Sequence, residues 1–282
     1  MCGAMSSRRM RYRADMGAML GPPRKTGQFA FQSRCLGIFS SWSSFSSVPN
    51  SSKLLFKQKP AKGTTRILMN HSRFILGSRS PRRRELLEML VSPELIDVRP
   101  PRSSDELGFE GLKSWLDIAQ RLQRIAREKN NDVLSQLSAS NNSQLVLTAD
   151  TVIVANDSDG GYRVLGQPPH DDLWRDVVRG WFRDLYAGRS HIAATSICLT
   201  EFGSGRRLER IVQSHVWFRD DVEPLLDWYL ATQEPCGKAG GYALQGLGSV
   251  FVTRVEGSIT NVVGLPLETL VEFLPQFGWP LK

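Results

Sequence analysis

Apolar β-rich runs alternate with helical segments from residue 73 to the end of the chain, and this alternation constrains the fold more than any other feature. The runs 73–78 (RFILGS) and 144–155 (QLVLTADTVIVA) have the composition of buried strands. Apolar residues recur with helical period in 114–137 and in 171–188. Because some strands follow one another directly and others are separated by helices, the pattern predicts an α/β fold with a mixed central sheet.

The second half of the chain continues this pattern. Two adjacent strands are predicted over 191–202 and 206–219, joined by a glycine-containing turn. A helix opened by acidic residues follows over 220–232. A strand over 249–257 and a final helix over 265–274, with a proline near its start, complete the prediction.

Residues 1–66 differ in composition from the rest of the chain. Twelve Lys and Arg residues and a single acid, Asp15, give this segment a formal charge of +11, so the remainder of a chain with net charge +8 carries −3. A segment rich in Ser and Arg without sustained periodicity is typical of a transit peptide, which predicts a mitochondrial or plastid location. Two alternatives stay open: a disordered tail without an address, and an internal start at Met69 that leaves the protein in the cytoplasm. The chain is therefore divided into an extension, 1–66, and a folded domain, 67–282.

Composition excludes several classes of protein. No apolar run reaches the roughly 18 residues that span a bilayer, so no membrane partner is expected. The four cysteines and four histidines lack the spacing of a zinc site or a disulfide framework. Because the domain without the extension has no net positive charge, nucleic acid is not an expected partner.

The stretch GSRSPRRRELLEML, residues 77–90, joins the end of a strand to a helix. Ser80 stands where a helix N-cap belongs and Pro81 at the first helical position, which places Arg82 and Arg83 in the first turn. Cations are unfavourable beside the exposed N–H groups of a helix start unless an anion binds there too, so the pattern indicates a phosphate site. A solvent-exposed basic face is the structural alternative.

Asp150 interrupts the apolar run 144–155. A carboxylate between two apolar half-strands must meet a cation, a metal or hydrogen-bond donors to offset its desolvation, and Thr151 beside it supplies a hydroxyl. The glycine-rich segment 237–248 carries Lys238 and Gln245, whose amide can pair with the edge of a base. Ordinary strand-end and loop chemistry explains each feature equally well when it is taken alone.

Taken together, five motifs in the same order make the chain similar to the Maf family of nucleoside triphosphate pyrophosphatases. The stretches that match are S-x-S-P-R-R at 78–83, A-R-E-K at 126–129, A-D-T at 149–151, K-A-G-x-Y-x-x-Q-G at 238–246 and N-x-V-G-L-P at 261–266. The resemblance runs from about residue 73 to the C-terminus.

The resemblance implies two α/β lobes around a deep nucleotide-binding cleft, as in Maf and ITPase-like proteins. In that cleft a nucleoside triphosphate is cut between its α and β phosphates with the help of a divalent metal such as Mg²⁺. It implies that Asp150 accepts the proton, that Asp150 and Glu106 bind the metal, and that the protein is a homodimer. The substrate-binding residues that it implies are Ser78, Arg82, Arg83, Lys129, Thr151, Lys238 and Gln245.

The resemblance also bears on substrate choice. Members that act on dTTP and UTP resemble this chain at Arg82, Thr151 and Gln245, so we expect a preference for pyrimidine triphosphates. Gln167 departs from the family, which usually has lysine in the corresponding L-G-K-P element. Because loss of a cation near phosphate weakens catalysis, the alternative function is a nucleotide-binding regulator of cell division with little activity.

Overall fold

The computed structural model of the chain describes residues 73–103, 108–138 and 144–281, so the predicted extension 1–66 lies outside the described residues. The described residues belong to a single compact unit. No helix in the described part is long and apolar enough to cross a membrane.

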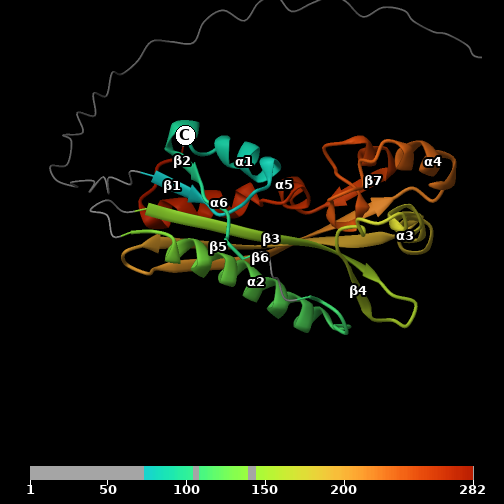
Figure 1. Ribbon diagram of the computed structural model, residues 1–282, viewed down its shortest axis with the longest axis horizontal. Coiled ribbons are helices and arrows are strands. Elements are labelled where there is room, and N and C mark those ends of the chain that lie inside the picture. Colours follow the sequence, from blue (N-terminus) through green and yellow to red (C-terminus); the bar gives the residue numbers. More distant parts are fainter. Residues whose placement is uncertain (1–72, 104–107, 139–143, 282) are drawn as a thin grey trace, which may run out of the picture. The chain divides into compact units, whose positions relative to one another are not determined.

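The core of this unit is one mixed sheet of seven strands (Figure 1), which confirms the predicted fold class. The strands are β1 (Arg73–Leu76), β2 (Ile96–Val98), β3 (Gln144–Asn156), β4 (Tyr162–Leu165), β5 (Ser190–Phe202), β6 (Arg207–Phe218) and β7 (Val252–Glu256). Their order is β2-β1-β3-β5-β6-β7, with β4 also paired to β3. The strand β1 runs parallel to β2 and β3, and all other pairs are antiparallel.

One edge of β3 is shared between two short strands. The strand β1 pairs with residues 144–147 of β3 and β4 pairs with residues 153–156, whereas β5 pairs with 144–154 along the opposite edge. Neither β1 nor β4 pairs with residues 148–152. The sheet is therefore open on one side at the Ala-Asp-Thr sequence, Ala149 to Thr151.

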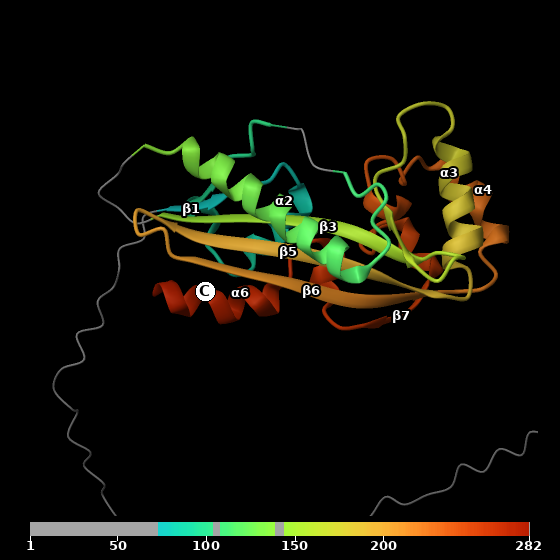
Figure 2. The ribbon, with the colours of Figure 1, turned by 90° about the horizontal axis from the view of Figure 1, so that it is seen from below.

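Helices cover both faces of the sheet (Figure 2). The long helix α2 (Trp115–Ser135) packs on β3 and β5, while α6 (Leu267–Phe273) lies on the opposite face. The other helices are α1 (Pro81–Glu88), α3 (Trp174–Gly180), which continues as the π-helix η2 (Trp181–Tyr186), α4 (Glu223–Ala231) and α5 (Ile259–Val263). Short 3₁₀ turns complete the fold: η1 (Pro93–Leu95), η3 (Ala239–Gly241), η4 (Leu247–Phe251) and η5 (Leu274–Phe277).

Some predicted boundaries were wrong. The strand predicted over 249–257 begins only at Val252, because η4 occupies Leu247–Phe251. The helix predicted over 171–188 is two helices in tandem, since the backbone changes from α to π geometry at Trp181. By contrast, α2 begins beside Ser114, whose hydroxyl accepts from the Asp117 N–H as an N-cap.

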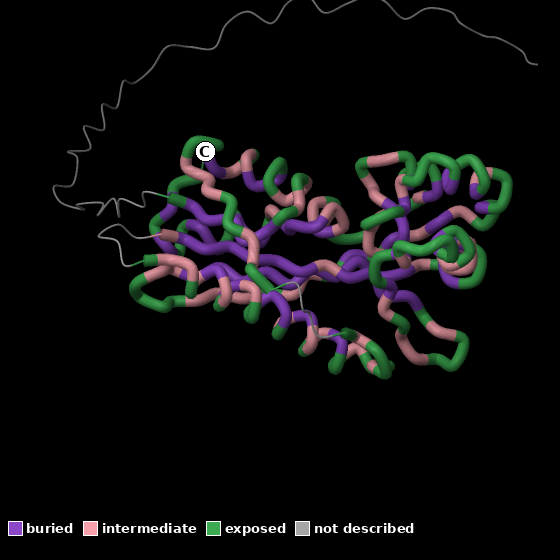
Figure 3. The backbone as a smooth tube through the Cα atoms, viewed as in Figure 1, coloured by how far each residue is buried: buried purple, intermediate pink, exposed green. Residues whose placement is uncertain are grey.

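Two principal hydrophobic cores share the long strands (Figure 3). One packs α1, α6 and η5 against the β1 end of the sheet, and it includes Phe74, Leu87 and Phe273. The other is aromatic and packs α3, η2, α4 and η4 against the β4 end, around Phe182 and Phe251. Residues 148–152 of β3 therefore lie between two hydrophobic cores, one at the β1 end and one at the β4 end.

His191 lies inside the aromatic core. Its Nε2 is hydrogen-bonded to Tyr242 OH at 2.7 Å, and its ring contacts Tyr186 and Phe218. Burial lowers the pKa of His191 to about 3. The native protein therefore keeps this imidazole neutral, whereas the unfolded chain takes up a proton below about pH 6.5.

We predict that His191 makes the native state less stable as the pH falls from 6.5 towards 3, because only the unfolded chain binds the proton in this range. In His191→Gln, the free energy of unfolding should depend less on pH in this window, by about 1.4 kcal/mol per pH unit. Urea titrations at several pH values measure this, with the exposed His170→Gln as the control substitution. Equal slopes in His191→Gln and wild type would contradict the prediction.

Candidate active site

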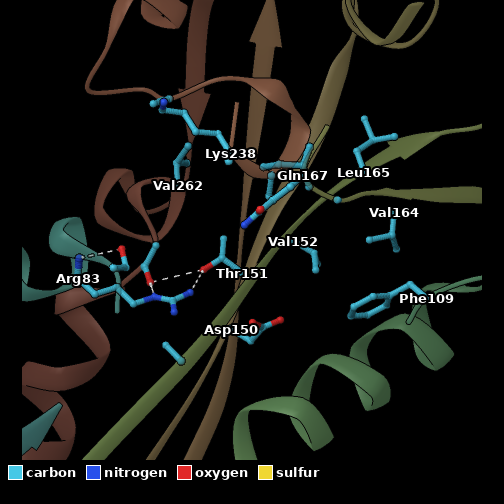
Figure 4. A pocket seen from close by; sticks show the side chains of 18 of the residues that line it. Arg83, Phe109, Asp150, Thr151, Val152, Val164, Leu165, Gln167, Lys238 and Val262 are labelled. Carbon is cyan, nitrogen blue, oxygen red and sulfur yellow. Dashed lines mark hydrogen bonds between the residues drawn. The ribbon is translucent and has the colours of Figure 1, made fainter. Parts of the chain in front are cut away.

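A cavity of about 1,200 Å³ opens at the unpaired edge of β3. It is lined by the start of α1, by β3 and β4, and by residues 108–113, 237–239, 242–245 and 262–264. Figure 4 shows side chains from these segments turned towards one space. Pockets of roughly 300–1,000 Å³ hold small ligands, so this cavity has room for a nucleotide.

The start of α1 has the predicted capped geometry. Ser80 Oγ accepts from the Arg83 N–H at 3.4 Å, and Ser78 Oγ accepts from the Ser80 N–H at 3.2 Å. Pro81 is the first helical residue, and the first turn contains no acid. The helix start is therefore positive, with Arg82 beside it at the cavity.

Lys238 approaches the same region from the opposite wall. Partial burial lowers the pKa of Lys238, Glu234 opposes this effect, and the positive charge of Arg82 lowers it further. The effect of Arg82 means that the two cations interact across the cavity. Such a pair repels itself until an anion lies between them.

Arg83 is held by protein acceptors. Its Nε donates to Gly264 O at 2.9 Å, Nη1 to Ser78 Oγ at 3.3 Å and Nη2 to Thr151 Oγ1 at 3.0 Å (Figure 4). The Thr151 hydroxyl is in turn hydrogen-bonded to that of Thr195, at 2.9 Å. Arg83 therefore joins α1, β3 and the turn after α5 into one support for the cavity.

Asp150 and Lys129 form an ion pair at the open edge of β3. Lys129 Nζ donates to Asp150 Oδ1 at 2.6 Å, and the side chains are 17% and 11% exposed respectively. Successive strand residues face opposite sides of a sheet, so Asp150 points towards α2 and Thr151 towards Arg83. The sequence predicted that Asp150, placed among apolar residues, must meet a cation, a metal or hydrogen-bond donors. In the structure its partner is the cation of Lys129.

The aromatic core holds the segment 238–245 through hydrogen bonds to its main chain. Tyr186 OH donates to Gly240 O at 2.9 Å and Tyr229 OH to Gly241 O at 3.1 Å, while the Gly240 N–H donates to Gly166 O at 2.9 Å. Gly240 has φ of +70°. A Cβ on it would lie 2.6 Å from Tyr186 OH and 2.7 Å from Ile153. The segment can take this path only with glycine there.

All but one of the residues predicted for the site line this cavity. They are Ser78, Arg82, Arg83, Lys129, Asp150, Thr151, Lys238 and Gln245. Glu106, predicted as a metal ligand, lies outside the described residues. Gln167, the residue that departs from the family pattern, also lines the cavity.

The structure adds residues that sequence analysis missed. The carbonyl of Gly264 and the hydroxyl of Thr195 complete the bonding around Arg83 and Thr151. An apolar wall, made by Phe109, Val152 and Val164, lies along the cavity near β4 (Figure 4). Only Gly264 had a signal in the sequence, because it belongs to the N-x-V-G-L-P motif.

No group of three or more His, Cys, Asp or Glu side chains that could hold a metal ion occurs within residues 73–103, 108–138 and 144–281. Asp150 nevertheless offers a carboxylate to the cavity. Mg²⁺ is commonly bound by one or two carboxylates together with substrate phosphates and water, so this donor set fits an ion that phosphates help to coordinate.

A mixed α/β fold whose cavity combines a helix start, several cations and one buried carboxylate defines a protein that binds a phosphorylated small molecule. Residues 73–277 match the family model described as Maf-like protein. The chain belongs to the Maf family.

Curated relatives resemble the chain over most of their length. A dTTP/UTP pyrophosphatase of Syntrophus aciditrophicus is 37% identical over 207 residues, which cover 73% of this chain and 90% of the relative. A protein of the same name from Brucella abortus is 34% identical over 215 residues, covering 74% and 93%. A solved nucleoside-triphosphatase / dITP/XTP pyrophosphatase from Mycobacterium abscessus aligns over 73% of this chain and 94% of its own, with 14% identity and a TM-score of 0.33.

We predict that Gly240→Ala destabilises the protein by about 2–5 kcal/mol, because the alanine adds backbone strain to overpacking against Tyr186 and Ile153. Gly160→Ala is the matched control, since Gly160 has φ of +78° but nothing within 4 Å of an added Cβ. It should cost only about 1–2 kcal/mol. Urea unfolding measures both, and equal losses would refute the steric argument.

Proposed function

We propose that this protein hydrolyses nucleoside triphosphates, with dTTP, UTP and modified pyrimidine analogues preferred, to the monophosphate and pyrophosphate. The observation that carries the proposal is that Arg82, Lys129 and Lys238 line the same cavity as one buried carboxylate, Asp150, which Lys129 contacts. The names of the relatives support the reaction and the pyrimidine preference.

The triphosphate would bind between the start of α1 and Lys238. The N–H groups of α1 and the side chains of Ser78 and Arg82 offer hydrogen bonds on one wall, and Lys238 offers its charge on the other. An anion between Arg82 and Lys238 relieves their mutual repulsion. Arg83, whose nitrogens already donate to Gly264, Ser78 and Thr151, would shape this site while adding its charge to it.

Asp150 would act as the proton acceptor. The oxygen of an attacking water forms a bond to the α phosphorus and its proton passes to Asp150, while the bond from the α phosphorus to the bridging oxygen breaks and its electron pair leaves on pyrophosphate. Lys129, which donates to Asp150 Oδ1, would orient this carboxylate. The cations of the opposite walls stabilise the charge that develops on the leaving group.

A divalent cation, Mg²⁺ in our proposal, would be held by an Asp150 oxygen and by the phosphates of the substrate, with Glu106 as a further proposed ligand. When bound, it supplies Lewis acidity that polarises the phosphoryl oxygens.

The nucleoside would lie along β3, away from the α1 end. The phosphates are drawn to Arg82 and the α1 N-terminus, so the rest of the substrate extends towards β4, where Phe109, Val152 and Val164 offer an apolar wall. Gln245 also lines the cavity and offers an amide donor and acceptor for the edge of a pyrimidine.

Three further proposals concern the whole chain. The protein would be a homodimer with no nucleic-acid partner. Residues 1–66 would be an extension that directs the domain 67–282 to a mitochondrion or plastid, and the cytoplasm is the alternative location. A fluorescent reporter fused to residues 1–66 tests the address, and light scattering tests the dimer.

Pyrophosphate release from dTTP and UTP with Mg²⁺, measured on the full chain against a panel of triphosphates, tests the proposed reaction. Asp150→Asn should lower kcat by about 100-fold or more, because asparagine cannot accept the proton. Asp159→Asn, which changes an acid that is 77% exposed on the β3–β4 turn, should keep wild-type activity. Full activity in a folded Asp150→Asn protein, as judged by circular dichroism, would remove Asp150 from the mechanism.

Gln167→Lys tests whether glutamine, in the place where the family usually has lysine, weakens catalysis. A lysine at this cavity position restores a cation near the phosphates, so kcat/KM should rise about tenfold to a hundredfold. Gln213→Lys adds the same charge on an exposed residue of β6 and should change little. Measurable UTP binding without turnover in wild type, followed by turnover in Gln167→Lys, would favour the nucleotide-binding regulator.

A further inference from the structure

Glu234 joins the two ends of the segment that carries Lys238 and Gln245. Its Oε2 accepts from the Leu247 N–H at 2.7 Å and its Oε1 from the Gly248 N–H at 3.0 Å. These N–H groups begin the 3₁₀ helix η4 and have no acceptor within it. The carboxylate therefore closes residues 234–248 into a ring, here called the 234–248 loop.

The main chain of the loop is fitted to this carboxylate. A Cβ on Gly246 would lie 2.5 Å from Glu234 Oε1, so the carboxylate can approach only because this residue is glycine. Tyr229 OH, from the aromatic core, shares its single proton between Oε1 at 3.3 Å and Gly241 O at 3.1 Å. The carboxylate of Glu234 is thus held by the aromatic core as well as by the main chain of the loop.

The same residue also holds Lys238. The Nζ of Lys238 donates to the backbone carbonyl of Glu234. The side chain of Glu234 therefore fixes the far end of the loop, and its main chain fixes the lysine at the near end. Both ends converge on one residue.

Glu234 itself does not line the cavity, whereas residues 237–239 and 242–245 do. It cannot touch a nucleotide bound there, but it determines where the residues that do so are held. A loop closed by charge-assisted hydrogen bonds loses less entropy when a ligand orders it, and small displacements of a binding group weaken binding strongly.

We propose that Glu234 is a positioning residue that sets Gln245 and Lys238 for the nucleotide and so determines the preference among pyrimidine bases. This inference rests on the proposed function of the cavity. Through Gln245, the carboxylate determines the selection of UTP over CTP, whereas the main-chain carbonyl of Glu234 holds Lys238 for the triphosphate.

The first test is Glu234→Gln in the full-length protein. The amide has the shape of the carboxylate, but its nitrogen cannot accept a hydrogen bond from a backbone N–H, so one of the two bonds that hold the far end of the loop is lost. We expect KM for UTP to rise about tenfold with a smaller change in kcat, because a displaced loop loses contacts made to bound substrate. The ratio of kcat/KM for UTP to that for CTP should fall.

Glu223→Gln is the matched control. Glu223 begins α4, pairs with Arg183 at the surface and does not line the cavity. The substitution removes the same charge without touching the loop, so the KM and the UTP-to-CTP ratio should stay at the wild-type values.

A double variant separates selection through Gln245 from a general loss of structure. If Glu234 acts on the base through Gln245, adding Glu234→Gln to Gln245→Ala should lower the UTP-to-CTP ratio no further, because interacting residues are not additive. A melting temperature lowered by Glu234→Gln, together with wild-type KM and an unchanged ratio, would overturn the proposal and leave Glu234 as a structural cap.

Hydrogen exchange tests the positioning without turnover. Amides of residues 239–248 should exchange faster in Glu234→Gln than in wild type and in Glu223→Gln, while those of β5 do not change. Unchanged exchange would overturn the proposal even if the enzyme is active. Faster exchange in a protein that cleaves no triphosphate would instead count against the proposed function alone. If Glu234→Gln does not fold, Tyr229→Phe removes the hydroxyl that bonds both Glu234 Oε1 and Gly241 O, and it should show a smaller effect of the same sign.

Discussion

The middle of β3 is hydrogen-bonded to a neighbouring strand on one edge only, and the cavity depends on this arrangement. The pairing of β3 with β1 ends at Leu147 and its pairing with β4 begins at Ile153, while β5 pairs with residues 144–154 along the other edge. A rigid strand thus carries Asp150 and Thr151 at an opening rather than in the middle of a sheet. One hydrophobic core packs the β1 end and another packs the β4 end, and together they hold the two sides of this opening apart.

The charged side chains around this opening come from different segments, and each interacts with groups of another segment. Lys129 compensates the buried carboxylate of Asp150, and Arg83 is held by acceptors from three segments. Arg82 and Lys238 repel each other across the cavity, which leaves a positive region beside the buried carboxylate of Asp150. An arrangement of this kind favours a polyanion, and the proposed divalent cation would bind between the phosphates and Asp150.

Much of the fold could be predicted from the sequence because its signals are local. The helical period of 115–135 and the cap at Ser114 define α2, and the apolar runs define β3 and β5. The start of β7 could not be predicted, because the apolar residues Val250 and Phe251 have the composition of a strand. They form a 3₁₀ turn, since Glu234 binds the N–H groups of Leu247 and Gly248. That contact joins residues far apart in sequence, and no local propensity encodes it.

The sequence by itself determined the α/β class, the capped helix start at Ser80, and the kinds of side chain that the cavity uses, because these follow from periodicity, composition and motif order. Only the tertiary structure decided which group meets which: that Lys129 pairs with Asp150, that Arg83 is committed to Gly264, Ser78 and Thr151, and that Glu234 closes the loop bearing Lys238 and Gln245. The physical reason is that partners for charged and polar groups are chosen by distance and desolvation in the folded chain, and spacing along the sequence specifies neither.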